Sequence, residues 1–207
     1  MLHFAVVFFL LAPLISNAKN VVLFLGDGMG VSTETSARIF ERQQQGKLGE
    51  EHSLSFEEFE NLALIKTYNT DAQVPDSAGT ISAILTGQKT RAGVSGVNAS
   101  VERGNCQDSL TNQLPTILEM AEQRGMRSGV VSTARITHAT PAGAYAHYIE
   151  RNWEDNDDLS EDAVTYGCKD IARQLVEFKH GDGVDIILGG GRANFLPQYD
   201  PDPEYES

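Results

Sequence analysis

The sequence predicts an α/β domain built on a mostly parallel sheet that is covered by helices on both faces. Two observations predict this class. Strand-like segments alternate with helix-like segments along the chain, and the strand-like segments are continuous apolar runs. A third observation sets the scale, because 207 residues, of which 41% are apolar, suffice for one sizeable core. In sheets of this kind, ligand sites gather where the strands end.

Four apolar runs are expected as strands, and the first of them ends in a glycine-rich turn. These runs cover residues 20–30, 62–70, 127–133 and 184–191. Residues 88–113 are polar and contain several glycines, so they are expected as loop. No internal repeat is visible in the chain.

Four segments carry helix signals. Residues 36–46 place apolar side chains at helical spacing, and residues 77–87 are small and apolar. Residues 114–125 have proline near their start and glycine at their end, which are typical helix boundaries. Residues 159–178 are expected as one long helix, since Ser160 can cap it and acidic residues follow in its first turn.

The charge and the N-terminus indicate a compartment. A formal net charge of −13 argues against nucleic acid or an anionic membrane surface as the main partner. Residues 1–18 combine a short apolar run with small residues before a cleavage point after Ala18, which indicates a secretory signal peptide. The alternatives are an N-terminal anchor or a buried strand. We therefore expect the secretory pathway and an extracellular or cell-surface location.

The expected secretory location bears on the two cysteines and on one candidate glycosylation site. Cys106 and Cys168 are the two cysteines, and an even number suggests one disulfide, with two buried thiols as the alternative. Asn98 opens the sequence Asn-Ala-Ser, which is a glycosylation acceptor pattern, although so short a pattern also arises by chance.

Ser77 lies in the stretch "VPDSAGT", which spans residues 74–80 and leads into a predicted helix. A serine at this place has two uses. It can cap the helix by accepting a backbone hydrogen bond, or it can act as a nucleophile beside the positive end of the helix dipole.

Asp27 follows the first apolar run in "LFLGDGMG". A charge at the end of a buried strand is costly unless something binds it, and the flanking glycines allow a close backbone approach. An Asx-turn and a dinucleotide-binding loop are alternatives, but the dinucleotide fingerprint needs a third glycine where Val31 stands. A metal-binding carboxylate fits better.

Polar residues also follow the third predicted strand, in "STARITHATPAGAYAH" at residues 132–147. His138, Thr140 and His147 lie here, and Arg151 follows among acidic residues. Taken alone, these positions are typical of ordinary loop residues and of a solvated charged segment.

Three stretches together resemble the alkaline phosphatases, most closely the animal branch. They are "FLGDGMG", "VPDSAGT" and "THATPAGAYAH…ERNW", and they occur in the family's order and at about its spacing. "YGCKDIARQL" and "DIILGGGR" extend the resemblance to most of residues 20–205. The resemblance implies hydrolysis of phosphate monoesters through a covalent phosphoserine at a site with two Zn²⁺ ions and one Mg²⁺ ion.

The resemblance also implies roles for individual residues. Asp27 would bridge one zinc and the magnesium, Ser77 would bind zinc and attack phosphorus, and Thr140 would bind magnesium. Arg151 would hold two phosphate oxygens with its planar guanidinium.

Three further assignments come from the same likeness. His138 would lie near the magnesium without binding it directly, and Asp76 would orient Arg151 or the helix entry at the substrate site. The two cysteines match a disulfide of the animal enzymes.

Complete family members are more than twice as long, and their later part carries the remaining metal ligands. Residues 19–207 are therefore expected to form the N-terminal part of a single, longer catalytic domain. This part is expected to be inactive by itself, and the activity is expected in the full-length form. The partners implied are a phosphomonoester substrate, a homodimer and a lipid anchor beyond Ser207. A short non-catalytic isoform that binds phosphate or a protein is the alternative. A sulfatase-like relative is disfavoured because "DSAGTIS" lacks the Pro-x-Arg that follows a sulfatase nucleophile.

Overall fold

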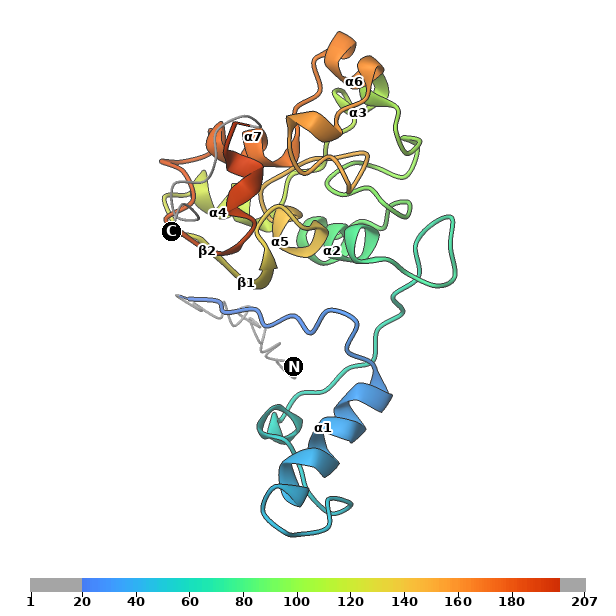
Figure 1. Cartoon of the computed structure of the whole chain (residues 1–207), viewed down its shortest axis with the longest axis vertical. Helices are drawn as coiled ribbons and strands as arrows, with labels where there is room; N and C mark the ends of the chain where they lie inside the picture. Colours follow the sequence, from blue (N-terminus) through green and yellow to red (C-terminus); the bar gives the residue numbers. More distant parts are fainter. Residues whose placement is uncertain (1–19, 198–207) are drawn as a thin grey trace, which may run out of the picture.

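A computed structural model of the chain describes residues 20–197 (Figure 1). The expected signal peptide at residues 1–18 lies outside the described residues. The α-helices are α1 Val31–Gln43, α2 Ser77–Thr86, α3 Cys106–Ser109, α4 Ile117–Glu122, α5 Ala139–Ala142, α6 Glu161–Tyr166 and α7 Ile171–Val176. The strands are β1 Gly129–Arg135 and β2 Ile186–Gly190, and the 3₁₀ helices are η1 Ser55–Glu58, η2 Asn156–Asp158 and η3 Arg192–Phe195.

The two strands form a parallel pair, which confirms the predicted α/β class. Gly129 lies opposite Ile186, and Arg135 lies opposite Gly190, with an irregularity in the register between Val131 and Arg135. Parallel strands need a long crossover, and here the chain between β1 and β2 carries α5, η2, α6 and α7. The carboxyl end of β1 leads directly into α5, so this edge of the sheet presents residues 136–143.

The first two predicted strands are absent from the described sheet. Residues 20–26 and 62–68 have no regular secondary structure, and all of their side chains are exposed. Helix α1 lies between them and projects away from the rest of the chain in Figure 1, and it contains no buried residue. A strand needs a hydrogen-bonded neighbour, and within residues 20–197 these two segments pair with neither β1 nor β2.

The predicted long helix at residues 159–178 is two helices. Helix α6 ends at Gly167, which adopts the left-handed conformation with φ 76° that favours glycine. Asp170 then caps α7, and its side chain accepts a hydrogen bond from the backbone N–H of Arg173 at 2.7 Å. The acidic and glycine residues that resembled helix interior are therefore a stop signal and a second start signal.

The remaining elements agree with the sequence patterns in type, though not in length. Helix α4 occupies the middle of the predicted 114–125 helix and begins with a capping box in which Thr116 and Glu119 exchange hydrogen bonds. Helix α1 begins five residues before the predicted segment 36–46. Residues 88–113 are loop except for the short α3.

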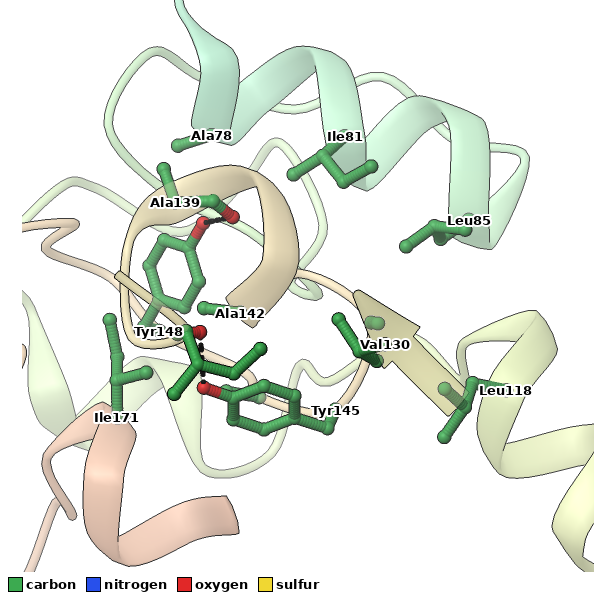
Figure 2. Packing of buried hydrophobic residues seen from close by; sticks show 13 residues of the cluster. Ala78, Ile81, Leu85, Leu118, Val130, Ala139, Ala142, Tyr145, Tyr148 and Ile171 are labelled. Atoms are coloured by element: carbon green, nitrogen blue, oxygen red, sulfur yellow. Dashed lines mark hydrogen bonds between the residues drawn. The ribbon is translucent and has the colours of Figure 1, made fainter. Parts of the chain in front are cut away.

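The main core lies between α2, α5 and the sheet (Figure 2). Two buried tyrosines fill it and keep their hydroxyl groups bonded: Tyr145 donates to the carbonyl of Ile136 at 2.8 Å, and Tyr148 donates to the carbonyl of Ala139 at 2.8 Å. Both bonds fix the turn from β1 into α5. The apolar residues around them are Ala78, Ile81, Leu85, Leu118, Val130, Ala142, Ala144, Ala146 and Ile171.

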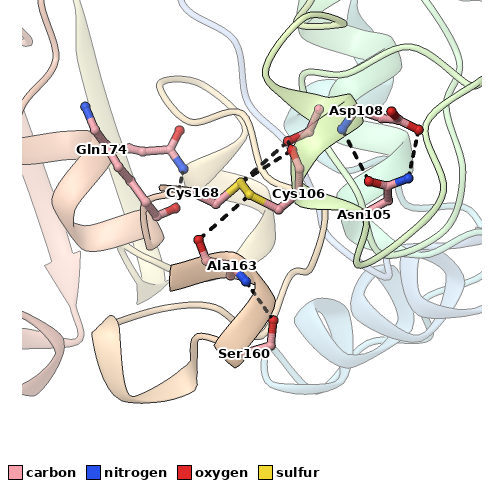
Figure 3. The surroundings of a disulfide bond; sticks show 9 residues. Asn105, Cys106, Asp108, Ser160, Ala163, Cys168 and Gln174 are labelled. Carbon is pink, nitrogen blue, oxygen red and sulfur yellow. Dashed lines mark hydrogen bonds between the residues drawn. A yellow bond between two sulfur atoms is a disulfide. The ribbon is translucent and has the colours of Figure 1, made fainter. Parts of the chain in front are cut away.

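A second core surrounds a disulfide between Cys106 and Cys168 (Figure 3). The bridge connects α3 to the segment that follows α6, across a sequence separation of 62 residues. Its neighbours include Val97, Ile149 and Trp153, all buried. The pairing is the one expected from the cysteine count, and the alternative of two free thiols does not occur in the structure.

No helix within residues 20–197 combines the length and the apolarity that are needed to cross a bilayer.

Candidate active site

Helix α2 begins at Ser77, but Ser77 does not cap it. The cap is Asp76, whose carboxylate accepts a hydrogen bond from the backbone N–H of Gly79 at 3.0 Å. Ser77 is the first helical residue, and its hydroxyl donates instead to Asp27 at 2.9 Å. The capping alternative for Ser77 is therefore wrong, because Asp76 is the residue that caps α2.

Asp27, Ser77 and Thr140 come together from three separate parts of the chain. Asp27 lies in the glycine-rich turn after residues 20–26, and Thr140 lies in α5, just beyond the carboxyl end of β1. The hydroxyl of Ser77 donates to one carboxylate oxygen of Asp27, and the hydroxyl of Thr140 donates to the other. Three oxygen-bearing side chains thus converge at the N-terminus of α2.

Asp76 is the centre of a second group beside the first. One of its carboxylate oxygens accepts from Gly79 N–H and from the amide of Asn69 at 2.8 Å. The other oxygen accepts from Gly93 N–H at 2.9 Å and from the Arg151 guanidinium at 3.2 Å. Burial alone would raise the pKa of Asp76, but these hydrogen bonds outweigh it and lower the pKa, so the carboxylate stays charged and holds Arg151.

Arg151 also approaches His138, with 3.4 Å between the guanidinium Nη2 and the imidazole Nε2. Arginine can only donate, so Nε2 of His138 is the atom that can accept in this contact. His138 therefore touches Arg151, whereas no contact joins it to the Asp27 group among the bonds of residues 20–197. The guanidinium retains donors beyond the one given to Asp76.

Gly79 explains the small residues after Ser77. A methyl group at this position would lie 2.5 Å from the side-chain oxygen of Asn69 and 2.8 Å from the carbonyl of Arg91. Both distances are too short for any side chain, so only glycine lets the first turn of α2 approach these two residues. The packing keeps the N-terminus of α2 against the loop that supplies Gly93.

The donor atoms determine which metal the site suits. A carboxylate and two hydroxyl groups supply oxygen only, and hard cations such as Mg²⁺ prefer oxygen ligands, whereas zinc sites usually include nitrogen or sulfur. Within the described residues, no group of three or more histidine, cysteine, aspartate or glutamate side chains is arranged to hold a metal ion. Asp27, Ser77 and Thr140 therefore fit part of a magnesium site and do not form a zinc site by themselves.

Comparison with known proteins shows the family to which the chain belongs. The alkaline phosphatase family profile matches residues 18–207. The chain belongs to the alkaline phosphatase family. The tissue-nonspecific alkaline phosphatase of Gallus gallus is 50% identical over 188 residues, which cover 91% of this chain and 36% of the relative. The chain thus spans about a third of that relative's length.

Solved structures of alkaline phosphatases agree with this assignment. The alkaline phosphatase of the Antarctic bacterium TAB5 superposes with a TM-score of 0.60 at 29% identity, covering 82% of this chain and 39% of the other. A histidine-to-glutamate variant of that enzyme, with a TM-score of 0.58 and 29% identity, covers 82% of this chain and 38% of its own and holds Mg in a site named M3.

The structure thus brings together Asp27, Ser77 and Thr140, and beside them Asp76, Arg151 and His138. His147 lies apart from both groups, since its ring bonds to Gly96 and Glu119. Sequence reasoning did not find Asn69, which binds Asp76. Its signal was the polar "YNT" at the end of the second apolar run, the same pattern that singled out Asp27.

Asn98 remains a predicted glycosylation site. Its side-chain amide donates to Asn112 at 2.8 Å, and the Ser100 hydroxyl donates to the Asn98 carbonyl oxygen. The side chain is half-buried. A glycan on this nitrogen would have to be attached before Asn112 packs against it.

Proposed function

We propose that the chain supplies the nucleophile side of a phosphomonoesterase active site, with Ser77 as the nucleophile. The observation that supports this most is the hydrogen bond from the Ser77 hydroxyl to Asp27. Because Asp76 caps α2, the Ser77 hydroxyl is free to make this bond. Residues 19–207 would form the N-terminal part of one alkaline-phosphatase-like catalytic domain. The substrate would be a phosphate monoester.

In this proposal the phosphoryl group binds between Ser77 and Arg151. The Arg151 guanidinium, fixed by the charged Asp76, donates to two phosphate oxygens, and the positive end of the α2 dipole adds to the attraction. The Ser77 oxygen forms a bond to phosphorus as the bond to the leaving oxygen breaks, and the proton lost by the Ser77 hydroxyl passes through water to the departing oxygen. Water later hydrolyses the phosphoserine and returns the serine hydroxyl and inorganic phosphate. Before the attack, Asp27 accepts the hydrogen bond of the Ser77 hydroxyl and so orients it.

Metal ions complete the proposal. Asp27 and Thr140 would hold Mg²⁺, and Asp27 and Ser77 would both be ligands of one of the two Zn²⁺ ions. The other zinc ligands would lie outside the described residues. The related TAB5 variant binds Mg in a site named M3, which supports a magnesium ion in this proposal, while the oxygen-only side chains of Asp27 and Thr140 support these two residues as ligands. When bound, such ions lower the pKa of a coordinated hydroxyl or water and neutralise charge on the phosphoryl oxygens.

The setting of the enzyme is also proposed. The animal relatives and the expected signal peptide favour the secretory pathway and an extracellular or cell-surface site. A homodimer and a lipid anchor are further proposals that rest on the family likeness alone.

The test is a chimera in which this chain replaces the matching portion of the Gallus gallus tissue-nonspecific isozyme. We expect the chimera to hydrolyse p-nitrophenyl phosphate and Ser77→Ala to lower turnover by orders of magnitude, with the metal content little changed because the other ligands remain. Thr80→Ala is the matched control, because its hydroxyl lies one turn further along α2 and donates to the Asp76 carbonyl at 2.8 Å. That control should retain most of the activity.

Labelled phosphate should also be trapped on Ser77 after an acid quench and located by peptide mapping. A label on Thr80 or Ser82, or near-normal turnover by the Ser77→Ala chimera, contradicts the proposal. If the parent chimera binds phosphate without turnover, the non-catalytic alternative is favoured instead.

A further inference from the structure

Glu154 lies three residues after Arg151, and its carboxylate accepts hydrogen bonds from several side chains. Arg135, the last residue of β1, donates to its two oxygens at 2.6 and 2.8 Å, in a bidentate pair. The side chain of Glu154 is only 13% exposed, whereas that of Arg135 is 52% exposed. The pair alone would be an ordinary ion pair at the end of a strand.

Two further donors make this carboxylate different. The buried Thr137 donates its hydroxyl to Glu154 at 2.6 Å, and the amide of Asn194 donates to the same oxygen at 3.0 Å. Asn194 also donates to the Thr137 hydroxyl at 2.7 Å, so that hydroxyl is both donor and acceptor and cannot rotate freely. One carboxylate therefore ties together β1, the turn after β1, and η3 after β2.

The place of this cluster connects it to the candidate active site. Thr137 immediately precedes His138 and is three residues from Thr140, and Glu154 belongs to the same short segment as Arg151. In the sequence, His138 and Thr140 follow Thr137, and Arg151 precedes Glu154. The bond from Thr137 to Glu154 joins these two segments, beside the contact between Arg151 and His138.

We propose that Glu154 is a positioning residue, which fixes the turn carrying His138 and Thr140 against the segment carrying Arg151. It touches neither substrate nor metal and acts through Thr137 and Arg135. The effect of this role on catalysis rests on the proposed function. The clamp itself, which consists of Glu154 with its bonds to Arg135, Thr137 and Asn194, is a property of this chain.

The charge of Glu154 is suited to this role. Burial would raise its pKa, but the hydrogen bonds from Arg135 and Thr137 and the Arg135 charge outweigh burial and lower the pKa. The carboxylate stays ionised at neutral pH and keeps all four acceptor contacts. A glutamine at this position keeps the shape but offers a single acceptor oxygen.

The first experiment measures hydrogen exchange in the whole 207-residue chain. Glu154→Gln and Thr137→Val, which leaves the Arg135 pair intact, should each speed exchange about tenfold in residues 136–143 and 151–155. The control is Glu177→Gln, because Glu177 also accepts from two cations, Lys169 at 2.6 Å and Arg173 at 2.7 Å, but lies in a different segment. Exchange at both segments no faster than in this control overturns the proposal.

The second experiment uses the chimera described above. In Glu154→Gln and Thr137→Val, the segments that carry Thr140 and Arg151 should be held less firmly. Both variants should therefore raise the KM, and the magnesium concentration needed for half-maximal activity, about tenfold, with a smaller change in kcat. A purely structural loss would instead lower the amount of active enzyme and leave KM unchanged, which overturns the positioning role. An inactive parent chimera contradicts the proposed function, and hydrogen exchange then still decides the clamp.

Discussion

Residues 20–67 and residues 69–178 contain similar apolar side chains and bury them very differently. Phe24 is 90% exposed and Leu64 is 96% exposed, whereas Tyr145 and Ile81 are each 2% exposed. Intrinsic hydrophobicity does not explain this contrast. In the second region, α2, α5 and β1 pack against one another around a buried core, while in the first region α1 contains no buried residue and the extended segments are exposed. Burial depends on a partner surface and not on the residue alone.

The candidate site lies across this boundary. Ser77, Thr140 and Arg151 belong to the packed region, but Asp27 belongs to the exposed one. Two hydrogen bonds, from Ser77 and Thr140, connect Asp27 to the other site residues. Ser77 and Arg151, the proposed nucleophile and the proposed phosphate-binding residue, are thus held by the packed region. Asp27, the proposed metal-binding carboxylate, is held by its bonds to Ser77 and Thr140.

The largest expected effect concerns the disulfide of the packed region. Replacing Cys106 and Cys168 by alanine should lower the free energy of unfolding by about 4 kcal/mol, because an open chain of this loop length gains that much conformational freedom when unfolded. Urea denaturation of the oxidised and substituted chains measures the change. A loss below about 1 kcal/mol would show that the second core does not depend on the bridge.

A smaller effect is expected in the main core. Ile81→Ala should lower the free energy of unfolding by about 2–4 kcal/mol, since it leaves a cavity between α2 and the residues around Gly143. Ile84→Ala is the matched control in the same helix, because Ile84 is 42% exposed. It should cost less than about 1 kcal/mol. Equal losses would contradict the packing of α2 that orients Ser77.

The third prediction is a pH dependence of stability. His147 bonds through one ring nitrogen to the carbonyl of Gly96 at 2.8 Å and through the other to Glu119 at 2.8 Å. Burial would lower the pKa of His147, but the hydrogen bond and charge of Glu119 outweigh it, so the pKa is raised. A protonated ring satisfies both acceptors.

The sign follows from the raised pKa. The contribution of His147 is fully present below the pKa of an unfolded histidine, about 6.5, and is lost as the pH rises through the folded value. Urea midpoints between pH 6 and pH 9 should therefore fall, and His147→Gln should flatten this slope. A slope that survives His147→Gln contradicts the assignment.

Local signals predicted the packed region well. Proline, glycine and capping residues identified the helix at residues 114–125, and the aspartate and serine of "PDSAGT" identified the start of α2. The choice between Asp76 and Ser77 as the cap needed the structure, because both residue types cap helices and only the position of Asp27 separates them. The residues of the candidate site were named from motifs, and the structure shows that they meet.

Other features could not be predicted locally. The sequence pattern predicts helix interior at Gly167, where the structure has a break, since one glycine in a helical pattern is often tolerated. The apolar runs at residues 20–26 and 62–68 had the composition of buried strands, but pairing depends on neighbours distant in the sequence. The Glu154 cluster joins residues 135, 137, 154 and 194, a combination without any spacing pattern.

The smallest expected effect tests the exposed region directly. Phe24→Ser should change the free energy of unfolding of the 207-residue chain by less than about 0.5 kcal/mol, because an exposed side chain loses little on replacement. The same change should make the chain more soluble, since exposed apolar segments promote association. The measurement is urea denaturation together with light scattering at increasing concentration. Tyr145→Ser is the matched aromatic control, and it should cost several kcal/mol because Tyr145 is buried and bonded to Ile136. If Phe24→Ser cost about 2 kcal/mol or more, residues 20–26 would be packed in solution, Asp27 would be anchored by the core, and the contrast between the two regions would disappear.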